Sequence, residues 1–70
     1  MTFSQEIGTR LREIRKELQI SQTDLAKQAG ISLKTITNVE KGDDVSISIL
    51  IKICKVLEIK PEINFRYHKY

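Results

Sequence analysis

The fold is decided by one stretch, which runs from Gln22 to Gly42 and reads QTDLAKQAGISLKTITNVEKG. Ser21 directly precedes it and has the short hydroxyl side chain that caps the first turn of a helix. Asp24, three residues later, completes a pattern like a capping box. Gly30 can adopt the left-handed conformation that ends a helix. A first short helix is therefore expected here, with three inward-facing residues, Leu25, Ala26 and Ala29.

The second half of the stretch repeats this arrangement. Ser32 can cap a helix over residues 33–40, and Gly42 can end it. Ile36 and Val39 are the expected inner residues of this helix. Two short helices joined by a few residues that include a glycine are typical of a helix-turn-helix. The whole stretch therefore predicts this motif.

A longer helix is expected before the motif. Ser4 is a suitable N-cap, and the helix should end between residues 17 and 19. Intervals of four, three and four residues place its apolar side chains on one stripe, which consists of Ile7, Leu11, Ile14 and Leu18.

The segment after the motif is ambiguous. Every second residue from Val45 to Ile53 is β-branched and apolar, which is typical of a strand. Helical spacing is present as well, at Leu50, Ile53, Cys54 and Leu57. The run is long for a strand, and β-branched residues lower helix propensity by only about 0.5 kcal/mol each. Periodicity leaves both alternatives open.

The last residues have a different pattern. Pro61 ends the preceding element. After it, Ile63, Phe65 and Tyr67 alternate with polar residues and predict a short strand. This strand has no partner within the chain, and an unpaired strand edge is unfavourable.

Composition narrows the class of protein. The chain has 70 residues, enough for one domain, with a net charge of +3 that favours anionic partners only weakly. From its first residues we expect no signal peptide, and it contains no apolar run long enough to span a membrane. Its single cysteine, Cys54, suits a reducing cytoplasm. His68 has no clustered metal-ligating residues nearby, and no catalytic constellation stands out. We expect a cytoplasmic protein without enzymatic activity, cofactor or metal.

Several residues of the decisive stretch resemble the helix-turn-helix of the XRE family, to which Cro and phage repressors belong. These residues are Gln22, Ala26, Gly30, Ile36 and the sequence Glu40-Lys41-Gly42. The resemblance extends over about residues 5–59. It implies an all-α fold, a compact lambda-repressor-like bundle of four to five short helices. It also implies a fourth helix over residues 47–57, capped by Ser46.

The sequence from Glu58 to Phe65 is similar to the end of HipB-type antitoxins. That resemblance implies a C-terminal β-strand that pairs across a dimer, with Ile63, Phe65 and Tyr67 in the interface. The expected organisation is a helix-turn-helix DNA-binding domain over residues 1–60, followed by a dimerisation element over residues 61–70.

The XRE resemblance also implies roles for individual residues. Base edges would be contacted by Leu33, Lys34, Thr37 and Asn38. Phosphates would be contacted by Gln22, Ser32, Thr35 and Lys41. Arg15 and Glu40 resemble a structural ion pair that joins the first helix to the end of the third.

The expected function is a homodimeric repressor that binds a palindromic operator in double-stranded DNA. Within that class, the small size and the HipB-like tail favour an antitoxin with a cognate toxin partner. A phage-type repressor or a restriction controller also fits the sequence. A different class is a protein-interaction module that kept the fold without DNA binding. Asp43 and Asp44 favour it, because they directly follow the third helix and would repel a phosphate.

Overall fold

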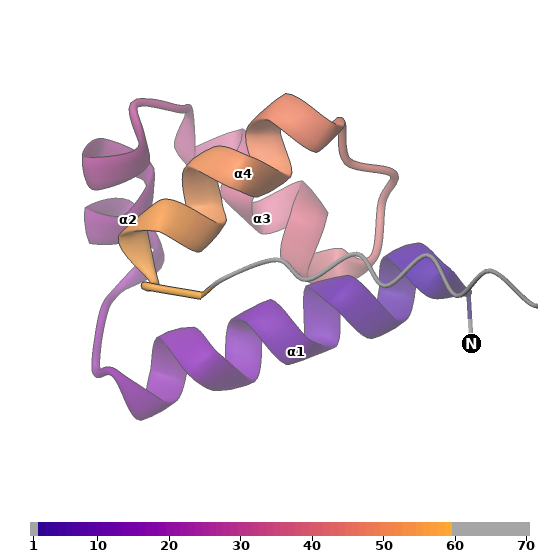
Figure 1. Ribbon diagram of the computed structural model, residues 1–70, viewed down its shortest axis with the longest axis horizontal. Coiled ribbons are helices and arrows are strands. Elements are labelled where there is room, and N and C mark those ends of the chain that lie inside the picture. The colour runs from indigo at the N-terminus through magenta and orange to yellow at the C-terminus, as the bar shows by residue number, and fades with distance from the viewer. Residues whose placement is uncertain (1, 60–70) are drawn as a thin grey trace, which may run out of the picture.

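The computed structural model describes residues 2–59, which form the four α-helices of Figure 1. They are α1 (Phe3–Glu17), α2 (Gln22–Ala29), α3 (Leu33–Lys41) and α4 (Ile47–Val56). The predicted all-α bundle is confirmed, and residues 2–59 contain no strand. The expected C-terminal strand and its interface residues lie outside the described residues.

The first helix begins earlier than the sequence predicts. Its N-cap is Thr2 rather than Ser4. The Gln5 N–H donates to Thr2 Oγ1 at 3.2 Å, and the Thr2 N–H donates to Gln5 Oε1 at 2.8 Å. This reciprocal capping box satisfies two backbone donors at once, which a single serine cap does not. Ser4 lies inside the helix, where its hydroxyl donates to Asp44 Oδ1 at 2.8 Å.

The other three helices begin at the predicted serines. Backbone N–H groups donate to the Oγ atoms of Ser21, Ser32 and Ser46 at 3.0, 3.1 and 3.2 Å. Asp24 does not complete the expected capping box, since no bond runs from the Ser21 N–H to its side chain. An aspartate is one methylene shorter than the Glu or Gln that usually makes this bond.

Two glycines end α2 and α3 as predicted. Gly30 and Gly42 are the C-caps, with φ angles of 70° and 102°. Side chains with a Cβ atom resist these angles, so both positions favour glycine.

The ambiguous fourth segment is a helix, as the XRE resemblance implies. Ile53, Cys54 and Leu57 are buried together, whereas Ile47 is 69% exposed and Ile51 is 40% exposed. The alternating isoleucines therefore fall on several faces of α4 instead of the two faces of a strand. Burial in the core overrides the weak β preference of these residues.

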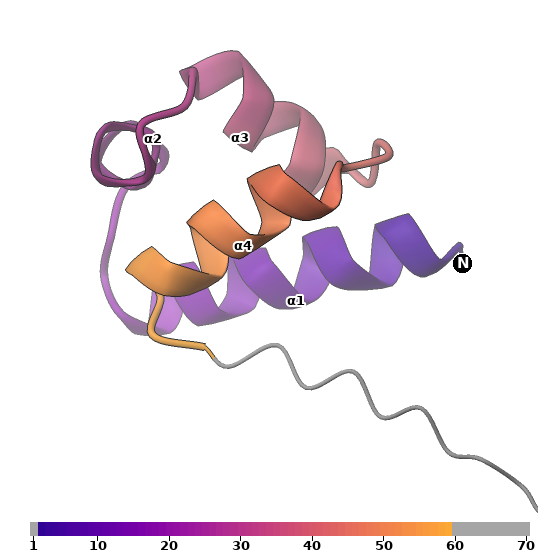
Figure 2. The same cartoon turned by 45° about the horizontal axis from the view of Figure 1, so that its top comes forward.

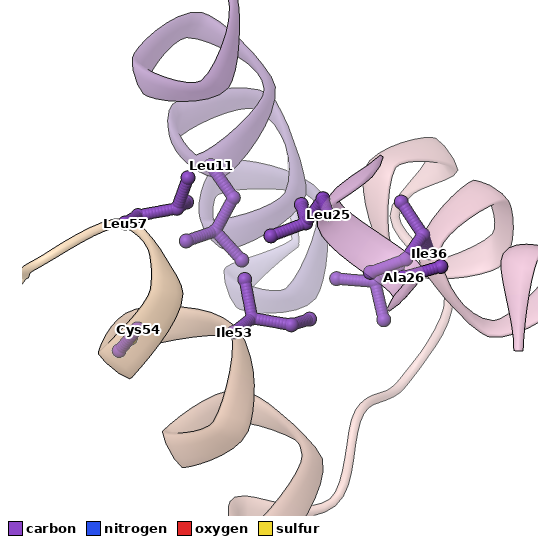
Figure 3. Close-up of a cluster of buried hydrophobic side chains, with 8 residues drawn as sticks. Leu11, Leu25, Ala26, Ile36, Ile53, Cys54 and Leu57 are labelled. Carbon is purple, nitrogen blue, oxygen red and sulfur yellow. The ribbon is translucent and has the colours of Figure 1, made fainter. Parts of the chain in front are cut away.

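The core lies where all four helices meet, and Figure 3 shows side chains from each of them converging. In the helix packing, α1 lies mainly against α3, while α2 lies against both α3 and α4. The buried apolar residues are Leu11, Leu25, Ala26, Ile36, Val39, Ile53, Cys54 and Leu57. The expected stripe on α1 is only partly buried: Leu18, its last member, is 49% exposed because the helix has already ended there.

Gly8 sets the distance between α1 and α3. A Cβ atom at this position would overlap with the carbonyl oxygen of Val39. The two helix backbones therefore touch at Gly8, which the sequence pattern does not reveal. No helix in the described part of the chain is long and apolar enough to cross a membrane.

Candidate nucleic-acid interface

The outer face of α3 carries the four residues expected to contact bases. Ile36 and Val39 are buried on its inner face. Leu33 is 47% exposed and Lys34 is exposed, while Thr37 and Asn38 are half-buried at the edges of the face. The Thr37 hydroxyl donates to the Leu33 carbonyl at 3.0 Å, so it keeps only acceptor capacity for another molecule.

Asn38 lies beside a shallow hollow of about 250 Å³ between the end of α3 and the start of α4. Asp43, Asp44 and Thr35 line the same hollow. One edge of the α3 face is therefore close to two exposed carboxylates, while residues 33–39 themselves carry no acidic side chain.

The residues expected to contact phosphate are held in different ways. Ser32 and Thr35 are tied to each other, with 2.8 Å between their hydroxyl oxygens. Lys41 is exposed in the last turn of α3. The Gln22 side chain is half-buried, and its Nε2 donates to Glu40 Oε1 at 3.1 Å. One of the two Nε2 hydrogens is therefore used within the protein, and Gln22 can offer an outside anion the other one together with its backbone N–H in the first turn of α2.

Arg15 and Glu40 form a buried ion pair with two parallel hydrogen bonds. Arg15 Nε donates to Glu40 Oε2 at 2.7 Å, and Arg15 Nη2 donates to Glu40 Oε1 at 3.0 Å. Arg15 Nη1 also donates to the carbonyl of Ile20 at 2.8 Å. Arg15 is 8% exposed, and with the Gln22 bond the network joins α1, α2, α3 and the turn after α1. Bidentate, charge-assisted hydrogen bonds of this kind fix the relative orientation of the two side chains as well as neutralising their charges.

A groove of about 380 Å³ lies above this network. We call it the polar groove, and it is lined by Arg12, Arg15, Gln22, Thr37, Glu40 and Lys41. Arg15 and Glu40 neutralise each other, so the remaining charges are the exposed cations Arg12 and Lys41. The groove therefore suits an anion.

Arg12 is the residue of this groove that the sequence interpretation missed. It lies three residues before Arg15, and residues three apart share one side of a helix. That spacing was the available signal. The structure thus brings Gln22, Thr37 and Lys41 together with Arg12, and it leaves Lys34 and Leu33 further along the α3 face.

Cys54 is a core residue. It is buried on α4, and this burial raises the pKa of its thiol above the ordinary value. The side chain is therefore a neutral apolar group at physiological pH. The described residues contain no cluster of three metal-ligating side chains.

Comparison with known proteins identifies relatives of this chain and solved structures with a similar fold. Residues 11–64 match the helix-turn-helix family HTH_3. An uncharacterised HTH-type transcriptional regulator of Methanocaldococcus jannaschii is 39% identical over 59 residues, which cover 83% of this chain and 89% of the relative. The regulator YgzD of Bacillus subtilis is 35% identical over 54 residues, covering 76% and 82%. Relatives from Pyrococcus furiosus and Archaeoglobus fulgidus are longer, and the chain spans 18% and 16% of their lengths.

Solved structures show the same fold. The restriction-modification controller protein C.AhdI from Aeromonas hydrophila superposes with a TM-score of 0.79 at 34% identity, covering 83% of this chain and 89% of that one. HipB in complex with an O2 20mer superposes with a TM-score of 0.82 at 25% identity, covering 91% and 90%. The four helices, the motif over residues 22–42 and these relatives together show that the chain belongs to the helix-turn-helix family.

Proposed function

We propose that the chain binds double-stranded DNA with α3 in the major groove and represses transcription by occluding an operator. The observation that carries this proposal is the surface itself. An exposed helix face without acidic residues adjoins a groove whose free charges, Arg12 and Lys41, are both positive. An exposed α-helix fits the width of the major groove, and cations beside it can pair with the phosphates.

The side chains of α3 have the chemistry for base readout. Lys34 can donate to O6 and N7 of guanine, and Asn38 can make two hydrogen bonds to adenine. Leu33 can contact the methyl group of thymine. Thr37, whose hydroxyl proton is used within the helix, can accept a bond from a base amino group.

The polar groove and the α3 N-terminus would set the register on the backbone. Arg12 and Lys41 would bind phosphates directly, together with the backbone N–H of Gln22. Ser32 and Thr35 share one hydroxyl hydrogen between them, so the other hydroxyl could donate its hydrogen to a phosphate while Ser32 Oγ keeps its capping bond. Arg15 and Glu40 would hold these groups in place without touching DNA.

We further propose that two copies bind one palindromic operator, with half-sites about 34–36 Å apart, because one chain reads only one half-site. The segment that carries Ile63, Phe65 and Tyr67 would join the copies by pairing its backbone edge with the same edge of the second copy. The likeness to C.AhdI supports a restriction controller, and the likeness to HipB, which is also solved in a HipA-HipB-O2-O3 complex, supports an antitoxin with a toxin partner. The sequence of the neighbouring reading frame distinguishes the two.

Selection from a random duplex pool tests the proposal with the full chain. We expect a palindromic sequence to be enriched, with two chains per selected duplex in sedimentation. Affinity should fall steeply with salt, because bound phosphates release counterions. Absence of both an enriched sequence and salt-dependent binding would overturn the proposal.

The same experiment decides a second candidate function, the protein-interaction module. Asp43 and Asp44 favour it, because both are exposed beside Asn38 on the edge of the α3 face. If these carboxylates are what exclude DNA, the parent will fail to bind the pool and the neutral Asp43→Asn and Asp44→Asn variants will bind it, whereas failure of the variants as well would show that the α3 face itself has no affinity for DNA. If the chain binds DNA, these variants should bind generic duplex more tightly than the parent.

A further inference from the structure

A second groove lies on the opposite side of α1, next to α4. It has a volume of about 310 Å³, and its lining is almost entirely apolar. We call it the apolar groove, and it is lined by Ile7, Arg10, Leu11, Ile14, Leu50 and Ile59. The guanidinium of Arg10 pairs with Glu13 at 3.3 Å, so Arg10 contributes mainly its aliphatic stem to the groove.

No helix among residues 2–59 closes this groove. The main packing partner of α1 is α3, and the main packing partner of α4 is α2. In Figure 2, α4 lies in front of α1, with the chain turning back towards α1 after the last turn of α4. Ile7, Ile14, Leu50 and Ile59 are consequently only half-buried. A contiguous apolar surface of this kind on a small domain marks a contact with another segment or molecule.

The chain itself supplies a candidate for that contact. Ile59, a lining residue, is the last described residue, so the chain continues directly from the groove. The next residues are KPEINFRYHKY, numbers 60–70. In an extended segment, Ile63, Phe65 and Tyr67 fall on one face and the polar residues between them on the other.

The segment of residues 60–70 is long enough to reach along the apolar groove. Eleven residues reach about 36 Å when extended. The 15 residues of α1 span about 22 Å. The segment can therefore run along the whole groove with residues to spare.

We propose that residues 62–68 cover the apolar groove of their own chain, with Ile63, Phe65 and Tyr67 packed against Ile7, Ile14 and Leu50. Ile63 is only four residues from Ile59, so closing the loop costs little entropy. The polar residues of the segment would face water, and its outer backbone edge would remain available to a second copy. The inference concerns the protein without DNA and does not depend on the proposed function.

Tyrosine fluorescence tests this proposal in the full chain. The chain has two tyrosines, Tyr67 and Tyr70, and no tryptophan, so its emission comes from the last four residues. The Tyr70→Phe variant reports Tyr67, and the matched Tyr67→Phe variant reports Tyr70. We expect acrylamide to quench Tyr67 at least threefold less efficiently than Tyr70, independently of protein concentration. Equal quenching would overturn the proposal, and so would protection of Tyr67 that disappears on dilution, since that result assigns the segment to a second copy.

A double-mutant cycle identifies the surface that the segment covers. The unfolding equilibrium is measured for Ile14→Ala, Phe65→Ala and the combination. A control cycle uses Ile51→Ala in place of Ile14→Ala, because Ile51 is also partly exposed but lies outside the groove. We expect the groove pair to deviate from additivity at least threefold in the equilibrium constant, and the control pair to be additive within twofold. Additivity in both cycles would place the segment elsewhere, and Ile7→Ala serves as a second groove variant if Ile14→Ala does not fold.

Discussion

The two grooves that flank α1 differ in the contacts that close their floors. The polar groove and the apolar groove have similar volumes, about 380 and 310 Å³. The floor of the polar groove is closed by the hydrogen bonds of Arg15, Glu40 and Gln22, and every buried side-chain polar atom in the described residues has a partner. The apolar groove has no such closure, because its half-buried isoleucines still contact water.

The difference lies in the kind of contact that stabilises each groove. Directional bonds under the polar groove hold three helices in fixed positions, so the cations at its rim have a defined spacing. Hydrophobic contacts around the apolar groove are not directional and can be completed by any apolar segment. Substitutions that disturb the packing of α1, α2 and α3 around the polar groove should therefore lower stability, and substitutions at its rim should weaken DNA binding. The following predictions measure both effects.

The largest effect is expected for Arg15→Ala. It leaves the buried carboxylate of Glu40 without its charged partner, and breaking a buried pair in this way costs about 3–5 kcal/mol. Urea unfolding measures the loss. The matched control is Arg10→Ala, which removes the exposed pair between Arg10 and Glu13 and should cost less than about 1 kcal/mol. Equal losses for both variants would show that the network under the polar groove is no more than a surface pair.

Gly8→Ala should have the next largest effect. The added methyl group overlaps with the Val39 carbonyl, and overpacking of this kind costs about 1–3 kcal/mol. The loss should appear despite a gain of up to about 1 kcal/mol in helix propensity. Thr9→Ala, an exposed neighbour on α1, should change stability by less than about 0.5 kcal/mol. A Gly8→Ala variant as stable as the parent would mean that α1 and α3 can separate without cost.

The contrast between these positions shows what the sequence can predict. Serine caps and terminal glycines act locally, so α2 and α3 could be predicted from short patterns. The close approach of Gly8 to Val39 joins residues far apart in the chain, and no local pattern reports it. The same holds for Gln22, whose amide donates one of its two hydrogens to Glu40 on another helix.

The fourth helix illustrates a second limit. The alternation from Val45 to Ile53 indicated a strand as strongly as the spacing of the core residues indicated a helix. Only the position of this segment against α2 and the core decides between them, and that information is tertiary. The family resemblance supplied it, whereas periodicity did not. Arg12 was missed for a related reason, because its role depends on a groove formed by three helices.

Lys34→Ala tests whether the face beside the polar groove reads bases. Affinity for the selected duplex should fall by about 1–3 kcal/mol, with a smaller loss for a random duplex, because a base contact discriminates between sequences. Fluorescence anisotropy with both duplexes measures the two values. Lys55→Ala, an exposed lysine on α4, is the charge-matched control and should change neither affinity by more than a few tenths of a kcal/mol. An equal loss on both duplexes would move Lys34 from the bases to the phosphates.

Arg12→Ala should have the smallest effect, and the effect should be of a different kind. Arg12 is exposed at the rim of the polar groove, so its loss should leave stability unchanged within about 0.5 kcal/mol. A phosphate contact carries no sequence information, so affinity should decrease by a similar factor for the selected and the random duplex. The slope of log affinity against log salt should become shallower by about 1, since one fewer phosphate is neutralised. Lys16→Ala, an exposed cation on α1 outside this groove, should leave the slope unchanged. If both variants change the slope equally, the effect arises from net charge, and the polar groove has no special role in holding the backbone.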